Sequence, residues 1–241
     1  MSSRAPAATE WQIDVDGERT VALFEASQRP PSLEPDTLFV CAHGAGGHRD
    51  DSAMLRLARM YVGRGLGMVR FNFLYRARGS GRPDPMPRLQ ACMRAVIERS
   101  RTETAATRII IGGRSMGGRT ASMLAAEGMP CDGLLLLAYP LHPAERPDKL
   151  RDAHLGAIRV PVLCLNGTRD ALCRRELMEA ALRSVVAPWD MHWLEGADHG
   201  FHVLKSSGRS DAQVMTEVGD ATEAWLGHLH QAVAKPMSAL R

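Results

Sequence analysis

The sequence predicts an α/β fold, with a mostly parallel twisted sheet and helices on both of its faces. Continuous apolar runs, typical of buried strands, alternate along the chain with segments whose apolar residues recur at helical spacing. One of these runs leads through a glycine-rich turn directly into a helical segment. The chain has 241 residues, of which 45% are hydrophobic and 24% charged, so it can bury a sizeable core and is neither disordered nor collagen-like in composition.

The chain begins with a predicted hairpin. Asp16-Gly17, a dipeptide typical of tight turns, lies between the strand-like residues 10–15 and 20–26. Three prolines between positions 28 and 36 predict a loop. The run Thr37–Ala42 that follows predicts a strand buried on both faces.

Helices and strands alternate from there to the end of the chain. Apolar residues at spacings of three and four predict a helix over residues 54–62, closed by Gly63 and Gly65. The other expected helices are one that opens after Pro83 and Pro85, one over 116–127, and a long last one that carries Val214 and Leu229. The other expected strands are 67–73, 108–113, 133–139, 160–166 and 191–194.

No break in composition separates two domains. We therefore expect a single domain over residues 10–234, after a flexible N-terminus at residues 1–9 and before a tail at residues 235–241. From the strand that ends near Ala138 to the one that begins near Val162, the chain advances 162 − 138 = 24 positions. This length fits a single helix and no cap domain, so the site should be open.

The charge balance and composition exclude several classes of protein. Lys plus Arg is 30 and Asp plus Glu is 27, and a net charge of +3 is too mild to indicate nucleic-acid binding. No apolar run is long enough to span a membrane, and the N-terminus lacks the apolar segment of a signal peptide. The five cysteines form no CxxC pair, which favours reduced, mostly buried thiols. We expect a cytoplasmic protein without a metal or cofactor.

The sharpest motif is Gly113-Arg114-Ser115-Met116-Gly117, a G-x-S-x-G sequence followed by another glycine. The pattern alone is weak, but here a strand with three isoleucines enters it and an alanine-rich helix leaves it, which is the context of a nucleophile elbow. Such a turn is strained and needs small neighbours, and the helix N-terminus favours negative charge beside the serine. The alternative is a glycine-rich turn that happens to hold a serine.

A nucleophilic serine needs a base and an acid that orients the base, and in this arrangement they follow in the order Ser, Asp, His. Asp170 follows a predicted strand, at the sheet edge where catalytic groups gather, although it could instead cap the next helix. His199 comes directly after the last predicted strand, and we favour it over the rival base His202. Asp132 precedes its strand, and Asp198 is too close to His199 to reach its Nδ1.

Small residues follow the first buried strand in the segment His43-Gly44-Ala45-Gly46-Gly47. They allow backbone N–H groups to approach a substrate oxygen closely. We expect one oxyanion donor to be the N–H of Met116, after the nucleophile, and the other to be the N–H of Ala45. A plain turn is the alternative, whereas a phosphate-binding loop is not expected because GxxxxGK[ST] is absent.

Arginines gather at the same predicted sheet edge. Arg76, Arg78 and Arg82 follow a strand within the loop region 75–87, and two more arginines flank the nucleophile turn. A guanidinium can bind a carboxylate or phosphate with two hydrogen bonds, but a solvated loop with surface charges is the alternative. The residues that we expect to line the substrate site are His43, Gly44, Arg76, Arg78, Arg114 and Tyr139.

Over nearly the whole chain, from about Trp11 to Val233, the motifs resemble the α/β-hydrolase superfamily. The segments that carry a more specific resemblance are 43–46, 70–73, 113–119, 139–143, 154–155, 161–163 and 167–170. Together they resemble the hydrolase-like family that contains testis-expressed protein thirty and the domain in non-specific-lethal complex subunit three. Dienelactone hydrolases are more distantly similar.

This resemblance implies a serine hydrolase with the triad Ser115, Asp170 and His199. Dienelactone hydrolases carry a cysteine where this chain has Ser115, so their activity is not expected here. We expect an enzyme that hydrolyses carboxylic esters or thioesters of small acyl substrates. Because one member of the family acts in a chromatin complex, a non-catalytic binding module is the alternative. A peptidase of the oligopeptidase type is less expected, since the chain has no propeller or other gating domain.

Overall fold

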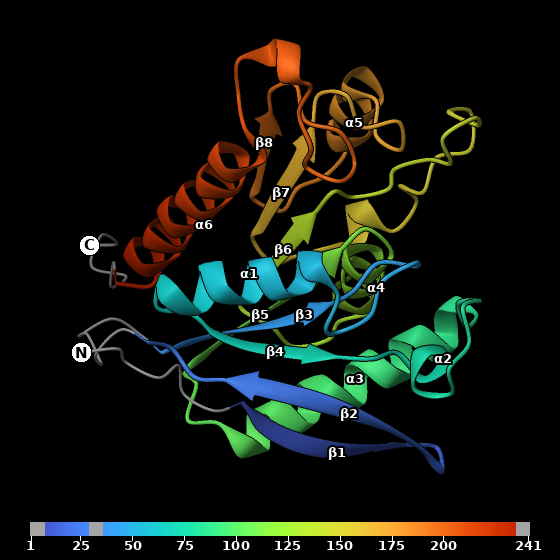
Figure 1. Ribbon diagram of the computed structural model, residues 1–241, viewed down its shortest axis with the longest axis vertical. Helices are drawn as coiled ribbons and strands as arrows, with labels where there is room; N and C mark the ends of the chain where they lie inside the picture. The colour runs from blue at the N-terminus through green and yellow to red at the C-terminus, as the bar shows by residue number, and fades with distance from the viewer. Residues whose placement is uncertain (1–7, 29–35, 235–241) are drawn as a thin grey trace, which may run out of the picture.

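An eight-stranded sheet forms the centre of the computed structural model, which describes residues 8–28 and 36–234. The strand order is β1-β2-β4-β3-β5-β6-β7-β8 (Figure 1). All pairs from β4 to β8 are parallel, and only β2 is antiparallel to its neighbours β1 and β4. Of the predicted flexible N-terminus at residues 1–9, residues 1–7 lie outside the described residues, whereas Thr9 already belongs to a strand. The predicted C-terminal tail and most of the predicted proline-rich loop also lie outside the described residues.

The strands follow the predicted order closely. Their bounds are β1 Thr9–Val15, β2 Glu18–Glu25, β3 Thr37–Ala42, β4 Gly67–Phe71, β5 Arg108–Arg114, β6 Gly133–Leu137, β7 Val162–Gly167 and β8 Trp189–Leu194. The predicted hairpin is confirmed, with Asp16 and Gly17 at φ values of 52° and 82° between its two strands. Positive φ at both central residues is the backbone that a two-residue hairpin turn requires.

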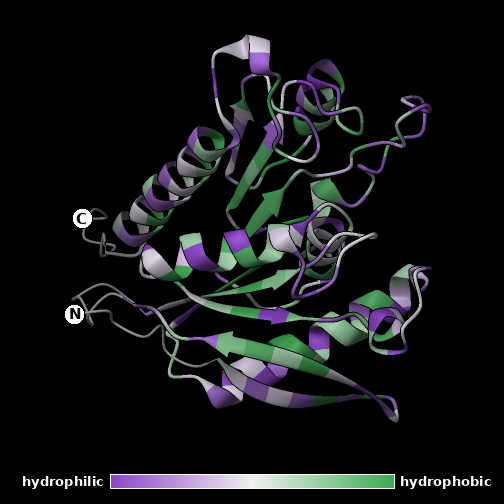
Figure 2. Ribbon diagram, in the orientation of Figure 1, coloured by the Kyte–Doolittle hydropathy of each residue, from purple (hydrophilic) through white to green (hydrophobic). Residues whose placement is uncertain are grey.

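Helices cover both faces of the sheet. Their bounds are α1 Ser52–Gly63, α2 Leu74–Ala77, α3 Met86–Glu103, α4 Met116–Ala126, α5 Arg175–Leu182 and α6 Asp211–Ala234. One face is covered by α1 and α6, which contact each other, and the opposite face by α3 and α4 (Figure 1). The strands at the centre are mostly hydrophobic, whereas α1 and α6 carry hydrophilic residues on their outer sides (Figure 2). This is the predicted α/β architecture.

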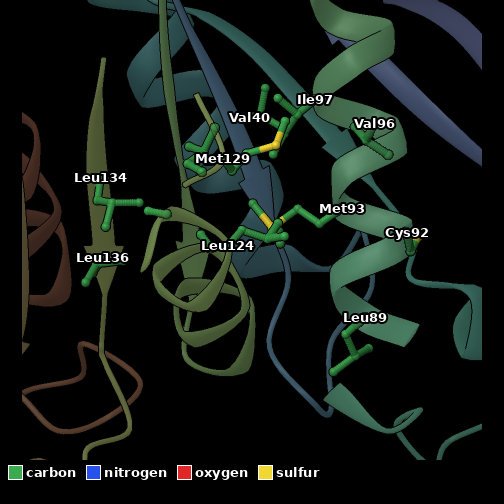
Figure 3. Close-up of a cluster of buried hydrophobic side chains, with 14 of the residues drawn as sticks. Val40, Leu89, Cys92, Met93, Val96, Ile97, Leu124, Met129, Leu134 and Leu136 are labelled. Carbon is green, nitrogen blue, oxygen red and sulfur yellow. The ribbon is translucent and has the colours of Figure 1, made fainter. Parts of the chain in front are cut away.

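The core between the sheet and α3 and α4 is built from interlocking apolar side chains. Met93 and Ile97 of α3 lie near Val40 of β3 and Leu124 of α4 (Figure 3). All four side chains are almost completely buried. Because α4 is fixed in this way against the sheet, the turn at its N-terminus has a defined position at the carboxyl ends of the strands.

One expected helix is absent. The connection from β6 to β7 was expected to hold a single helix, but it contains only a short 3-10 turn, η1 Leu155–Ala157. Pro140, Pro143 and Pro147 interrupt the first half of the connection, and proline inside a helix removes a hydrogen bond and clashes with the preceding turn. The connection also holds no cap domain, so the carboxyl edge of the sheet is not covered from this segment.

Candidate active site

The predicted nucleophile lies in a sharp turn between β5 and α4. Ser115 has φ 51° and ψ −114°, a strained backbone conformation for a residue with a side chain. Its N–H donates to the Leu137 carbonyl at 2.8 Å, and its own carbonyl accepts from Arg119 N at 3.0 Å. The turn is therefore held from the neighbouring strand and by the first turn of the helix, as a nucleophile elbow is.

The glycines around Ser115 are required for steric reasons. A Cβ added to Gly112, Gly113, Gly117 or Gly118 would come within 3.0 Å of a backbone atom, which real Cβ atoms essentially never do. At Gly112 the obstacle is the carbonyl of Leu135, in the neighbouring strand β6. The packing of β5 and α4 against the sheet thus depends on the absence of side chains here, as the motif predicts.

Substitution of Gly112 by Ala should destabilise the fold, because the β5–β6 backbones would have to separate. We expect a loss of about 3 kcal/mol or more in the free energy of unfolding, at the upper end for overpacked cores. Urea denaturation measures it. The matched control is Gly227→Ala in α6, where an added Cβ meets nothing within 4 Å. This control should be neutral or raise the stability by up to ~1 kcal/mol through helix propensity. Equal stability of the two variants would contradict the steric account.

The structure brings the three predicted triad residues together. His199 Nε2 lies 2.9 Å from Ser115 Oγ, and His199 Nδ1 lies 2.8 Å from Asp170 Oδ2. Because a carboxylate only accepts hydrogen bonds, Nδ1 carries the proton and Nε2 is left to accept from the serine hydroxyl. The Asp170 side chain is fully buried, whereas that of His199 is 29% exposed. This is the order of contacts that general-base activation of a serine requires.

Asp170 contacts His199 and does not cap the following helix, whose N-cap is Arg174. Its Oδ1 accepts from Leu172 N at 2.8 Å and so fixes the turn after β7, while Oδ2 holds His199. Asn166, which sequence reasoning missed as a site residue, donates from Nδ2 to Oδ2 at 3.2 Å. The same amide exchanges two hydrogen bonds with the backbone of Tyr139, at 3.0 and 3.1 Å. It thereby couples the acid to the end of β6.

A tight turn positions His199 and separates it from the rival His202. Asp198 Oδ1 accepts from Gly200 N at 2.7 Å and from His202 N at 3.0 Å. The His202 ring pairs instead with Asp211 of α6, at 2.6 Å. Arg114 donates to the His199 carbonyl at 3.0 Å. His199 is thus the histidine that reaches the serine, and Arg114 holds its backbone.

In the segment after β3, hydrogen bonds from nearby groups hold the carbonyls of Gly44 and Ala45 in place. The Gly44 carbonyl accepts from His43 Nδ1 at 2.7 Å and from Gly47 N at 3.0 Å. The Ala45 carbonyl accepts from the Tyr75 hydroxyl at 2.8 Å. Because the C=O and N–H of a trans peptide point in opposite directions, holding the Gly44 carbonyl also fixes the direction of the Ala45 N–H. The predicted donor from this loop therefore has a defined orientation.

His43 holds the loop as a neutral imidazole. The ring is completely buried, and Nε2 accepts from Phe73 N at 3.2 Å while Nδ1 donates to Gly44. Burial lowers the pKa of His43 to about 4. An unfolded histidine titrates near 6.5, so as pH falls below 6.5 the unfolded chain takes up a proton that the folded one refuses until about pH 4. This group therefore lowers the stability of the fold as pH falls through that window.

We predict that His43 stays neutral at pH 5. Histidine ring resonances followed by NMR from pH 7.5 to 4.5 test this, with His43 assigned by its loss in His43→Gln. Because the pKa of His43 is lower in the folded protein than in the unfolded chain, the free energy of unfolding should decrease by about 2 kcal/mol between pH 8 and pH 5. A His43 resonance with a midpoint near 6.5 would contradict the assignment of this ring as a buried, neutral loop anchor.

The other side chains expected at the substrate have partners within the protein. Arg76 donates to the Gly47 carbonyl at 2.8 Å and to the Gly46 carbonyl at 2.6 Å, so it supports the loop after β3. Arg78 pairs with Glu18 and with Asp84. Both arginines were expected to bind substrate, and both instead have structural partners. Their partners depend on the packing of α2 against the loop, which the linear pattern of charges did not indicate.

Tyr139 is likewise engaged within the fold. Its hydroxyl donates to the Arg151 carbonyl at 2.8 Å, and its ring is completely buried. Gly44, in contrast, lies against the nucleophile, since a Cβ added there would meet Ser115 Cβ at 3.5 Å. Of the residues expected to line the substrate site, Gly44 is thus beside the reacting serine, whereas Tyr139 supports the β6–β7 connection.

Among residues 8–28 and 36–234, no group of three or more His, Cys, Asp or Glu could hold a metal ion. No helix within these ranges is long and apolar enough to cross a membrane. A hollow of about 690 Å³ lies between β8 and α6, and no triad residue lines it. Four of the five cysteines are buried, as the sequence predicts.

A comparison with protein families assigns the fold. A family model described as an alpha/beta hydrolase domain matches residues 35–227 of this chain. The chain belongs to this α/β hydrolase family. The matched range includes the strand–turn–helix unit of Ser115 and the positions of Asp170 and His199. The narrower resemblance to the branch of testis-expressed protein thirty stays a prediction.

Solved structures show the same α/β hydrolase fold. A serine hydrolase without a lid from Xanthomonas campestris has a TM-score of 0.71 and 18% sequence identity, and the match covers 93% of this chain and 98% of the Xanthomonas chain. A dienelactone hydrolase from Anabaena variabilis has a TM-score of 0.70 and 17% identity, with coverage of 93% and 99%. An esterase domain from Rhodothermus marinus has a TM-score of 0.66 and 17% identity, with coverage of 90% and 97%. At these identities the likeness concerns the fold.

Proposed function

We propose that this α/β hydrolase cleaves carboxylic esters or thioesters through an acyl-enzyme on Ser115. The observation that carries the proposal is the position of His199, between Ser115 Oγ at 2.9 Å and Asp170 Oδ2 at 2.8 Å. A serine becomes a useful nucleophile at neutral pH when a base stands within hydrogen-bond reach and a third group orients that base. Support for an ester substrate also comes from the esterase domain of similar fold described above.

In the first half of the reaction, His199 Nε2 takes the proton of Ser115 while Oγ attacks the acyl carbon. The carbonyl oxygen becomes an oxyanion, which the N–H groups of Ala45 and Met116 would bind. Asp170 stabilises the imidazolium that forms and keeps the ring in its tautomer. When the tetrahedral intermediate collapses, His199 gives its proton to the leaving alcohol or thiol, and the acyl group remains on Ser115.

In the second half, water replaces the leaving group. His199 takes a proton from the water, and the hydroxide formed attacks the acyl carbon. Collapse of the second intermediate returns the proton to Ser115 Oγ and releases the carboxylic acid. Every proton transfer passes through one imidazole, and the partly exposed ring gives water access to it.

A substrate panel tests this proposal. The purified protein is assayed against p-nitrophenyl esters and acyl thioesters of two to twelve carbons, with a fluorophosphonate probe as an independent measure of an activated serine. We expect turnover of at least one acyl series of the panel and labelling by the probe. A protein that turns over nothing in the panel and resists the probe would be the non-catalytic binding module instead.

A further inference from the structure

One helical turn after Ser115 lies an arginine whose side chain has no partner among the described residues. Arg119 belongs to the first turn of α4, where its N–H donates to the Ser115 carbonyl at 3.0 Å. Within residues 8–28 and 36–234, its side chain makes no hydrogen bond or ion pair, and its Nε is buried without a partner. The residue is only partly buried, so its guanidinium can be reached from outside. A buried N–H of a charged group without an acceptor is costly and calls for an explanation.

A second arginine, Arg151, belongs to the β6–β7 connection, which contacts α4 through the hydrogen bond between His154 and Ser122. Arg151 donates from its backbone N–H to the Leu141 carbonyl at 2.8 Å, and its guanidinium reaches only the Pro140 carbonyl, at 3.3 Å. No carboxylate in the described chain pairs with it. Burial, and then the positive charge of Arg119, lower the pKa of Arg151. The two guanidinium groups therefore repel each other in a partly desolvated place.

Among the described residues, no neighbouring acidic side chain forms an ion pair with either arginine. His154 bonds through Nε2 to Ser122 Oγ at 2.8 Å, and Ser122 Oγ donates to the Arg119 carbonyl at 2.8 Å. Burial, followed by the charge of Arg119, lowers the pKa of His154 to about 4. Asp152 and Glu127 lie near enough to act on His154, but neither forms an ion pair with Arg119 or Arg151. Neither guanidinium is therefore paired directly with a carboxylate of the described chain.

Both arginines belong to segments that are tied to the triad by hydrogen bonds. Arg119 is four residues after Ser115, about 6 Å along the helix, and helical side chains lean toward the N-terminus, which is the end that holds Ser115. Arg151 is tied to the segment that leaves β6, because its carbonyl accepts from the Tyr139 hydroxyl. The Tyr139 backbone in turn bonds to Asn166, which bonds to Asp170.

We propose that Arg119 and Arg151 bind a carboxylate at the far end of the substrate's acyl chain. The proposal rests on the proposed function, since it places this anion on the ester that Ser115 attacks. A carboxylate would give the unpartnered Arg119 Nε an acceptor and relieve the repulsion between the two guanidinium groups. Arginine is suited to this because its planar donors match both oxygens of a carboxylate. The preferred substrates are then half-esters of dicarboxylic acids a few carbons long.

Matched pairs of esters test the proposal. Monoethyl adipate is compared with ethyl hexanoate, and monoethyl glutarate with ethyl pentanoate, by proton release at constant pH. We expect kcat/KM of the wild type to be at least tenfold higher for the anionic ester of each pair. Arg119→Gln should lower kcat/KM for the anionic esters by about 10- to 100-fold, mainly through KM, and change the neutral esters less than threefold. Arg119→Lys should recover part of the preference.

Two variants keep this test decisive. Arg159→Gln removes the same charge from the same connection at an exposed arginine that bonds only local carbonyls, and it should leave the anionic preference unchanged. Arg151→Gln provides an independent change if Arg119→Gln does not fold. Equal kcat/KM for both members of the ester pairs in the wild type, or equal losses on both in Arg119→Gln, would overturn the subsite.

A binding measurement separates the subsite from catalysis. Calorimetric titration of free adipate into Ser115→Ala requires no turnover. We expect binding that weakens with added salt and is lost when Arg119→Gln is added to the same background. If adipate binds in this way while the wild type hydrolyses no ester, the proposed esterase function fails and the anion site stands. If esters are hydrolysed and adipate does not bind, the subsite fails alone.

Discussion

Replacing Ser115 with Ala should lower kcat for ester hydrolysis by about 10⁴- to 10⁶-fold, because it removes the hydroxyl that hydrogen-bonds to His199 Nε2 and would form the acyl-enzyme. Substrate affinity should change little, since the oxyanion donors and the acyl site are intact. The measurement is steady-state hydrolysis of the best p-nitrophenyl ester of the panel. Thermal denaturation of the same sample shows whether the fold is retained.

The control for this variant is a serine of another helix. Ser100 is buried in α3 and donates only to the Val96 carbonyl of its own helix, at 2.7 Å. Ser100→Ala removes a hydroxyl without touching the site, so kcat should stay within twofold of the wild type. If Ser115→Ala retained more than a few per cent of the wild-type kcat, another nucleophile would carry the reaction.

Replacing Asp170 with Asn should lower kcat by about 10⁴-fold while leaving the fold intact. The asparagine amide can donate to His199 Nδ1, which moves the ring proton to Nε2. That nitrogen can then no longer accept the proton of Ser115 Oγ. The loss should appear in kcat at every pH where the imidazole is neutral, and the fluorophosphonate labelling rate should fall in parallel.

The chain offers a matched control for the acid. Asp211 pairs with His202 Nδ1 at 2.6 Å, so Asp211→Asn changes the same atoms in an aspartate–histidine pair outside the site. We expect its kcat to stay within twofold of the wild type. An equal loss of activity in both variants would mean that the effect of Asp170→Asn comes from general disturbance of the histidine-bearing loop.

The parts of the site that the sequence predicted depend on local chain geometry. The turn of Ser115 could be predicted from four neighbouring glycines, because a Cβ added at any of them would come within 3.0 Å of a backbone atom. Asp170 and His199 could be predicted because parallel strands end at one edge of the sheet, so residues that follow β7 and β8 must lie near that turn. The number of residues between Ser115, Asp170 and His199 does not change which edge of the sheet they occupy.

The parts that could not be predicted depend on contacts between distant segments. Arg76 and Arg78 follow a strand at the correct edge, but only the packing of α2 shows that one holds the loop after β3 and the other pairs with Glu18. Asn166 stands inside the motif before Asp170, and nothing local reveals that its amide joins two strand ends. The lack of an α-helix after β6 does have a local cause in the sequence, because the prolines of that connection disfavour a helix.

The most direct test of the account is the site of covalent modification. The wild type is treated with a fluorophosphonate, digested, and analysed by mass spectrometry, beside Ser115→Ala and Ser100→Ala. In the wild type and in Ser100→Ala, we expect one adduct, on the peptide that carries Ser115. In Ser115→Ala, we expect no adduct. A wild type without an adduct, or an adduct that persists in Ser115→Ala, would contradict the claim that His199 and Asp170 activate Ser115.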